Sequence, residues 1–316
     1  MGEGSERFGP PSSDLFVAGG TRGYVSPGAR KEKLRKRSFA AAKAPGPRYA
    51  ELRSASAFSF LNGASLPEDL VSRAAALGLP AVALVDVNGL SGAPRFWKTA
   101  KAAGVRALVG AEVTIRDGRF TFEEQRRAAP LQRSSLLPGP LGLVPPPPPP
   151  GTPPPRLTLL AESQIGYRNL CKLLTAGALG KPKGEAAATW EQIATHAEGL
   201  HVLTGGEESP VHRALVSRGS GAARRLLSKL TALFPGRLHV ELQRHGLREE
   251  EHANRALVDL AASLKLPMLA TNGVRYARRD EKELHDALSC LRFRTTLDGA
   301  GARLQAHRER HLKGAA

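Results

Sequence analysis

Apolar and polar positions alternate along most of the chain in the way that is typical of an α/β protein. Residues 81–85 are a continuous apolar run of the kind that is buried on both faces of a parallel sheet, and 107–113 contains another. Between these runs, apolar residues recur at helical spacing over 93–103, and Gly104 follows as a helix end. A strand, a helix and a strand at this spacing predict a βαβ unit.

The same alternation continues on both sides of this unit. Upstream, the pattern from Tyr49 to Leu61 indicates a strand, and Ser65 is placed to cap a helix with Pro67 in its first turn. Downstream, we predict strands at 157–161, 200–204, 238–242 and 267–271, and helices at 166–174, 222–233, 248–264 and 282–291. No internal repeat is evident, and one interrupted α/β domain explains this order more simply than two domains.

Two segments do not share the pattern. Residues 1–47 are rich in Gly, Ser, Pro and Arg without a sustained period, which predicts a disordered basic tail. Residues 117–155 include the proline run 145–150, which cannot supply sheet hydrogen bonds, so we predict a surface insertion that acts as a spacer or as a proline-rich ligand. The expected ordered parts are 48–116 and 156–291, followed by 292–316.

The charge balance points to a polyanionic partner. Forty-six Lys and Arg stand against 29 Asp and Glu, which gives a net charge of +17 and favours contact with nucleic acid, although an Arg-rich genome is a plain alternative. The tail contains a basic run that would lie along a phosphate backbone or simply be solvated. Its members are Arg30, Lys31, Lys33, Arg35, Lys36 and Arg37.

Cysteine usage and hydropathy favour a cytoplasmic protein without a membrane partner. Cys171 and Cys290 lie far apart in the sequence, so neither a disulfide framework nor a zinc ribbon is indicated, and Cys171 is expected to be a helix core residue. No apolar run approaches the roughly 18 to 20 residues that span a bilayer, and no secretion signal is evident at the N-terminus.

Five short segments occur in an order that is informative: FSFLNGAS at 58–65, LVGAE at 108–112, GYRNL at 166–170, VELQRH at 240–245 and ATN at 270–272. Together they resemble the polymerase-and-histidinol-phosphatase (PHP) domain of C-family bacterial DNA polymerases. The resemblance runs from Tyr49 to about Leu312, and the sequence at 49–52 and 294–298 is closer to the error-prone branch of the family than to the replicative one. It implies a distorted (β/α)7 barrel, whereas the residue pattern alone fits a doubly wound open sheet equally well.

The resemblance also implies a metal cluster. Most residues of this chain at the corresponding positions differ from the expected metal ligands. Family members hold two or three divalent ions through a His-x-His pair, an Asp-His pair, a Glu, a Cys, further His and a final Asp-x-His, and these ions activate water. The corresponding positions hold Arg53, Ala55, Asp86, Val87, Glu112, Gly206, His245, Gly273 and Arg275. Only Asp86, Glu112 and His245 still match the ligand types.

We therefore expect no bound cofactor. Guanidinium groups repel divalent ions, so Arg53 and Arg275 are expected to fill the vacated space and to pair with Asp86 and Glu112. The alternative is a residual zinc or manganese site at Asp86, Glu112 and His245. Each of these three also has a plain interpretation, as a turn cap, an ion-pair partner and a loop histidine respectively.

Three interpretations of the chain follow from these observations. The first is a non-catalytic module of an error-prone polymerase system for DNA replication and translesion repair, which contacts DNA directly or through a polymerase body, a downstream polymerase fragment or other damage-tolerance subunits. The second is a metal-dependent phosphoesterase or 3′–5′ exonuclease, and the third is a relic that no longer folds. The palm domain of the family, with its acidic magnesium ligands, would follow Leu312, so we expect no DNA synthesis by this chain alone. The sequence is compatible with a gene fragment, a split subunit or a frameshift product.

Overall fold

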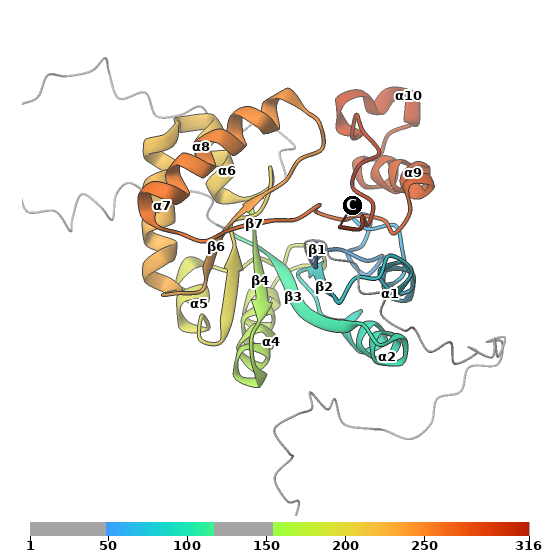
Figure 1. Cartoon of the computed structure of the whole chain (residues 1–316), viewed down its shortest axis with the longest axis horizontal. Helices are drawn as coiled ribbons and strands as arrows, with labels where there is room; N and C mark the ends of the chain where they lie inside the picture. Colours follow the sequence, from blue (N-terminus) through green and yellow to red (C-terminus); the bar gives the residue numbers. More distant parts are fainter. Residues whose placement is uncertain (1–48, 117–153, 316) are drawn as a thin grey trace, which may run out of the picture. The chain divides into compact units, whose positions relative to one another are not determined.

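The computed structural model describes residues 49–116 and 154–315 (Figure 1). The predicted basic tail with its run at 30–37, and almost all of the predicted insertion with its proline run, lie outside the described residues. All of the described residues belong to one compact unit. The two parts of the domain on either side of the insertion therefore belong to a single fold.

Seven strands form one sheet, and their order across the sheet is their order along the chain. They are β1 (Glu51–Ser54), β2 (Ala81–Val87), β3 (Arg106–Thr114), β4 (Arg156–Ala161), β5 (Leu200–Leu203), β6 (Leu238–Leu242) and β7 (Met268–Ala270). Neighbouring strands are parallel except that β4 is antiparallel to both β3 and β5. A doubly wound sheet would reverse its strand order at a switch point, so the sequential order excludes that alternative.

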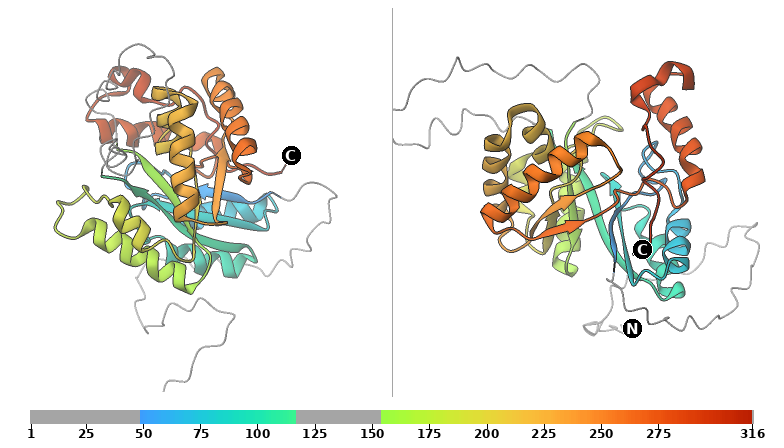
Figure 2. Two further views of the ribbon diagram at one scale, coloured as in Figure 1. Left: turned by 90° about the vertical axis from the view of Figure 1, so that its left-hand side faces the viewer. Right: turned by 45° about the horizontal axis from the view of Figure 1, so that its top comes forward.

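The sheet curls until the residues after β7 meet β1 again. The Ala55 N–H donates to the Val274 carbonyl at 2.9 Å, and the Val274 N–H donates to the Arg53 carbonyl at 2.8 Å. The curvature is visible in Figure 2, where β1 lies across from β7. The expected α/β fold with a curled, barrel-like sheet is confirmed, and the reversed strand β4 is its departure from a regular (β/α)7 order.

Most of the helices cover the outside of this sheet in two groups (Figures 1 and 2). The described α-helices are α1 (Pro67–Ala76), α2 (Ala93–Ala103), α4 (Gln164–Ala178), α5 (Trp190–Thr195), α6 (Pro210–Arg218), α7 (Ser220–Leu233), α8 (Arg248–Leu264), α9 (Lys282–Phe293) and α10 (Leu297–Ala300). One apolar core lies between α1, α2 and β2, and a larger one lies between β3 to β6 and α4 to α8. None of the helices in the described part of the chain has the length and apolar character needed to span a bilayer.

The sequence prediction holds best where an apolar run or a helical period is long. The predicted bounds of α2, β6 and α8 agree with the structure, whereas α5, α6 and α10 were not anticipated. The strand expected from Tyr49 to Leu61 is limited to β1, because the Asn62 N–H donates to the Ser59 carbonyl in a turn and Leu61 has a positive φ of 60°. Cys171 is only half-buried on α4.

A further difference concerns a contact rather than element bounds. Ser65 does not cap α1: its hydroxyl contacts Glu281 and accepts the Ala277 N–H at 2.6 Å, so it ties this turn to the chain after β7. Within residues 292–315, the predicted start of a connection to a polymerase palm, Leu312 is fully buried in the core beside α1. The Arg275 N–H also donates to the Arg310 carbonyl at 2.9 Å.

Gly166 at the start of α4 gives a test of this packing. A Cβ atom at Gly166 would lie 1.8 Å from the Gly199 carbonyl oxygen, which cannot move freely because it accepts the Glu162 N–H. Gly166→Ala should therefore lower the free energy of unfolding by about 3 kcal/mol in a denaturant titration. The control is Gly89→Ala, where the nearest atom would be 3.7 Å away, and its effect should stay within about 0.5 kcal/mol. Equal effects of the two substitutions would contradict the packing.

Candidate functional site

The inner face of the curled sheet has an apolar part and, toward one end of the strands, a charged part. Ala83, Val85, Leu160 and Leu203 form a small cluster in the apolar part. Because side chains on one strand face recur every second residue, Glu112 follows Gly110 on this face and Arg156 lies on the face of Leu160. Since β4 is antiparallel, its first residue reaches the same end as the last residues of its neighbours.

Glu112 is the centre of a buried set of ion pairs. Its Oε1 accepts from Arg53 Nε at 3.0 Å and lies 3.3 Å from Arg275 Nη2, while its Oε2 lies 3.4 Å from Arg156 Nη1. The residue is 0% exposed. Burial alone raises the pKa of the Glu112 carboxyl, but Arg275 and Arg53 outweigh it, so the pKa is lowered and the carboxylate stays ionised.

Two more carboxylates bring the negative charges around these three arginines to three. Glu208 Oε2 lies 2.8 Å from Arg275 Nη2 and also contacts Arg156 and Arg53 at 3.4 and 3.7 Å. Glu241 Oε1 lies 3.4 Å from Arg53 Nη1. Burial opposes ionisation of Glu208, yet the same arginines hold its pKa far below the usual range. We call these six residues the arginine–glutamate network: Arg53, Glu112, Arg156, Glu208, Glu241 and Arg275.

The side-chain amide of Gln243 lies beside Gly206 and Gly273, the two positions at which the resemblance implies a thiol and a carboxylate. A Cβ atom at Gly206 would lie 2.6 Å from Gln243 Oε1, and one at Gly273 would lie 2.7 Å from Gln243 Nε2. Gln243 Nε2 donates to Glu241 Oε1 at 2.6 Å. The two glycines thus leave room for a side chain that supports the network.

Asp86 does not pair with an arginine among the described residues, because the residues that follow β1 donate to its carboxylate. Its carboxylate accepts the Ser56 N–H at 2.7 Å and hydrogen bonds from the Ser56 and Ser59 hydroxyls. It has no guanidinium partner within 49–116 and 154–315, so the expected pairing with Arg53 or Arg275 is wrong for Asp86 and correct for Glu112. Asp86 instead anchors the turn after β1, and Val87 joins that turn through its N–H bond to the Ser59 hydroxyl.

His245 lies in a separate group with Glu250 and His307. Its Nδ1 is 2.5 Å from Glu250 Oε1 and its Nε2 is 2.9 Å from the Asn272 carbonyl oxygen, so both ring nitrogens lie against oxygen atoms. His307 stacks on it with ring centroids 4.7 Å apart. This trio is the one group among the described residues whose possible metal-ligand atoms lie within 4.8 Å of one another, and neither Asp86 nor Glu112 is in it.

Four members of the site were missed by sequence reasoning: Arg156, Glu208, Glu241 and Gln243. Arg156 is the first residue of a predicted strand, and its role depends on the reversed direction of that strand, which an apolar run does not reveal. Glu208 follows Gly206 by two residues in a loop, where charged residues are common. The alternation in β6, which places Glu241 on the inner face with His239, was the one usable signal.

The family model of the PHP domain matches residues 51–245, which are more than half of the chain. The chain belongs to the PHP family. The match includes five members of the arginine–glutamate network, Arg53, Glu112, Arg156, Glu208 and Glu241, whereas Arg275 lies after its end.

Curated relatives of this chain include error-prone DNA polymerases that are several times its length. It is 36% identical over 277 residues to an error-prone DNA polymerase of Anaeromyxobacter sp. (strain K), covering 85% of this chain and 20% of that protein. It is 36% identical over 271 residues to an error-prone DNA polymerase of Mycobacterium tuberculosis (strain ATCC 25618 / H37Rv), covering 84% and 22%. The chain thus spans about a fifth of the length of the curated relatives it matches.

Among solved structures, a similar chain is a proposed metal-dependent phosphoesterase from Bifidobacterium adolescentis. Its TM-score is 0.42 and its sequence identity is 13%, with coverage of 72% of this chain and 88% of the other.

Removing one buried carboxylate tests the network directly. Glu112→Gln leaves three guanidinium groups with too little negative charge, and breaking a buried pair in this way should lower the free energy of unfolding by about 3 to 5 kcal/mol. The matched control is Glu283→Gln, because Glu283 pairs with Arg308 at 3.1 Å with both side chains largely exposed. That change should cost less than about 1 kcal/mol. Denaturant titration measures both, and a Glu112→Gln effect no larger than that of the control would contradict the account.

Proposed function

We propose that this chain is the PHP-like module of an error-prone DNA polymerase and that the module itself is structural and non-catalytic. The ordered identity to error-prone polymerases over 84–85% of the chain supports the family context. DNA synthesis belongs to parts of those relatives that this chain does not cover. The partners that fit are a polymerase body or fragment, other damage-tolerance subunits, and DNA.

The observation that carries the non-catalytic role is the engagement of Glu112 by three guanidinium groups. A divalent ion at this carboxylate would have to displace Arg53 or Arg275 from contacts of 3.0 and 3.3 Å. Burial alone would lower the pKa of both arginines, but Glu112 raises it, so both guanidinium groups stay charged and repel a divalent ion. We propose that ion pairs occupy the place where other PHP domains hold metal.

The phosphoesterase alternative has one observation in its favour, the group of His245, Glu250 and His307. An ion there would need a lone pair from His245, whose two ring nitrogens face the acceptors Glu250 and the Asn272 carbonyl. Binding would therefore break at least one of these buried hydrogen bonds. The loss of such a hydrogen bond weighs against the phosphoesterase alternative and in favour of the structural, non-catalytic role.

Metal content and hydrolysis test the non-catalytic role. The full chain, purified without chelators, should contain well below one zinc or manganese ion per molecule by plasma mass spectrometry, because the donors that remain are already engaged. With added manganese, its hydrolysis of bis-p-nitrophenyl phosphate should equal that of the Asp86→Ala variant. Close to one ion per chain, or hydrolysis that Asp86→Ala abolishes, would restore the enzyme hypothesis.

Salt dependence tests the association with DNA that the net charge of +17 favours. Fluorescence anisotropy with primed DNA should give an affinity whose logarithm falls linearly with the logarithm of salt concentration, by about 0.9 per neutralised phosphate. Replacing all six basic residues of the run at 30–37 by Gln should reduce that slope. Replacing Arg30, Arg35 and Arg37 by Lys keeps the charge and should leave it unchanged. Absence of binding at low salt would remove the DNA-associating part of the proposal.

A further inference from the structure

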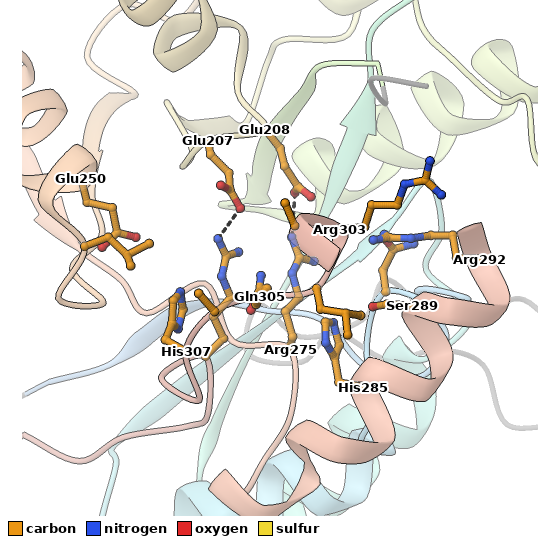
Figure 3. A pocket seen from close by; sticks show the side chains of 16 residues that line it. Glu207, Glu208, Glu250, Arg275, His285, Ser289, Arg292, Arg303, Gln305 and His307 are labelled. Atoms are coloured by element: carbon orange, nitrogen blue, oxygen red, sulfur yellow. Dashed lines mark hydrogen bonds and ion pairs between the residues drawn. The ribbon is translucent and has the colours of Figure 1, made fainter. Parts of the chain in front are cut away.

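Helix α9 buries its polar side and exposes its apolar side. Its four buried residues are mostly polar: Lys282, His285, Ser289 and Cys290. Figure 3 shows His285 and Ser289 directed into a pocket that Arg275 also lines. A helix that packs on a domain through one face normally turns its apolar residues inward and its polar residues outward. The orientation of α9 is the reverse, so its apolar residues face away from the domain.

The exposed side of α9 consists of three leucines and one alanine. They follow one another at a spacing of three and four residues, which places them on one face of the helix. Leu284 and Leu291 are 51% and 66% exposed. Between them, Ala287 is exposed and Leu288 is half-buried. We call these four residues the leucine face.

No element in the described part of the chain covers the leucine face. Among the helices and strands, α9 packs mainly against α10 and the 3₁₀ helix η1 (Arg279–Glu281). Figures 1 and 2 show α9 and α10 at the periphery of the unit. A single exposed leucine is common on protein surfaces, whereas several gathered on one helix face mark a surface that another molecule covers.

The charges beside the leucine face are complementary to those of a second copy of the same face. At about 100° per residue, Glu283 and Arg294 lie on the same flank of the face, Glu283 at the N-terminal end of α9 and Arg294 at its C-cap. When two copies of a helix pair antiparallel about a two-fold axis, one flank meets the same flank of the other copy with the ends exchanged. Glu283 of each copy then lies near Arg294 of the other, and Leu284 lies near Leu291.

Both charged groups are available for this contact. The side chain of Arg294 is exposed and has no carboxylate partner among residues 49–116 and 154–315. Glu283 contacts Arg308 at 3.1 Å through Oε1, which leaves Oε2 available, and its side chain is 78% exposed. The small side chain of Ala287 in the middle of the face lets two helices approach closely, because the distance between packed helices depends on the side chains at their contact.

We propose that the leucine face forms the interface of a two-fold, antiparallel dimer of this chain. Burial of the leucines supplies the driving force for association, and the pairs of Glu283 with Arg294 set the antiparallel direction. Because the interface is two-fold, each of these contacts occurs twice. The inference depends neither on the ion pairs at the strand ends nor on the polymerase context.

Sedimentation velocity of the full chain over a range of micromolar concentrations tests the dimer. At about 0.15 M salt, where repulsion between two chains of net charge +17 is screened beyond about 8 Å, the mass should rise to twice that of one chain. Leu291→Glu puts two carboxylates into the apolar interface and should raise the dissociation constant at least about tenfold. The matched control is Leu179→Glu, which should leave it unchanged, because Leu179 is 79% exposed at the end of α4. If circular dichroism shows that Leu291→Glu does not fold, Leu284→Glu takes its place.

Exchanging the two charges tests the antiparallel direction. Glu283→Arg and Arg294→Glu each bring like charges together twice in the dimer, so each alone should raise the dissociation constant about tenfold. The double variant restores opposite charges, and its dissociation constant should return to within about twofold of the wild-type value.

Three results overturn the proposal: a chain that stays monomeric, a dimer that Leu291→Glu leaves intact, and a double charge variant that does not recover. A monomeric chain that binds a purified polymerase fragment, and loses that binding on Leu291→Glu, overturns it in favour of a polymerase body as the molecule that covers the leucine face. Each of these outcomes leaves the metal and salt-dependence experiments unaffected.

Discussion

The inner end of the sheet depends on one buried carboxylate, Glu112, and on the three guanidinium groups that surround it. A carboxylate that is fully excluded from water is stable only if charges of the opposite sign replace its hydration. Arg53, Arg156 and Arg275 supply those charges from β1, β4 and the chain after β7. One side chain thereby links the first strand, the reversed strand and the segment that closes the curl.

We propose that this balance of charge takes the place of the metal cluster that the family resemblance implies. A metal cluster joins strand ends by bonding ligands from several of them, and here ion pairs join strand ends. Glu208 and Glu241 supply the two negative charges that Glu112 alone does not, and Gln243 lies in the space that a side chain at Gly206 or Gly273 would need.

Much of the fold was predictable from the sequence because long apolar runs and helical periods are local properties. The pairing of Arg53 and Arg275 with Glu112 was also predictable, since the family positions converge at one end of a barrel. The partners Arg156, Glu208 and Glu241 were not, because their convergence depends on the direction of β4 and on the path of the loop after β5. The expected pairing of Asp86 with an arginine was wrong because Ser56 and Ser59, which lie in the turn after β1, hydrogen-bond its carboxylate instead.

We propose that guanidinium groups, not metal ions, occupy the strand-end site of this PHP domain. Anomalous diffraction from crystals grown with excess manganese tests this most directly. We expect no anomalous peak near Glu112, with Arg53 Nε still within hydrogen-bond distance of its carboxylate. A peak coordinated by Glu112 together with Asp86 or His245, with the arginines turned away, would contradict it.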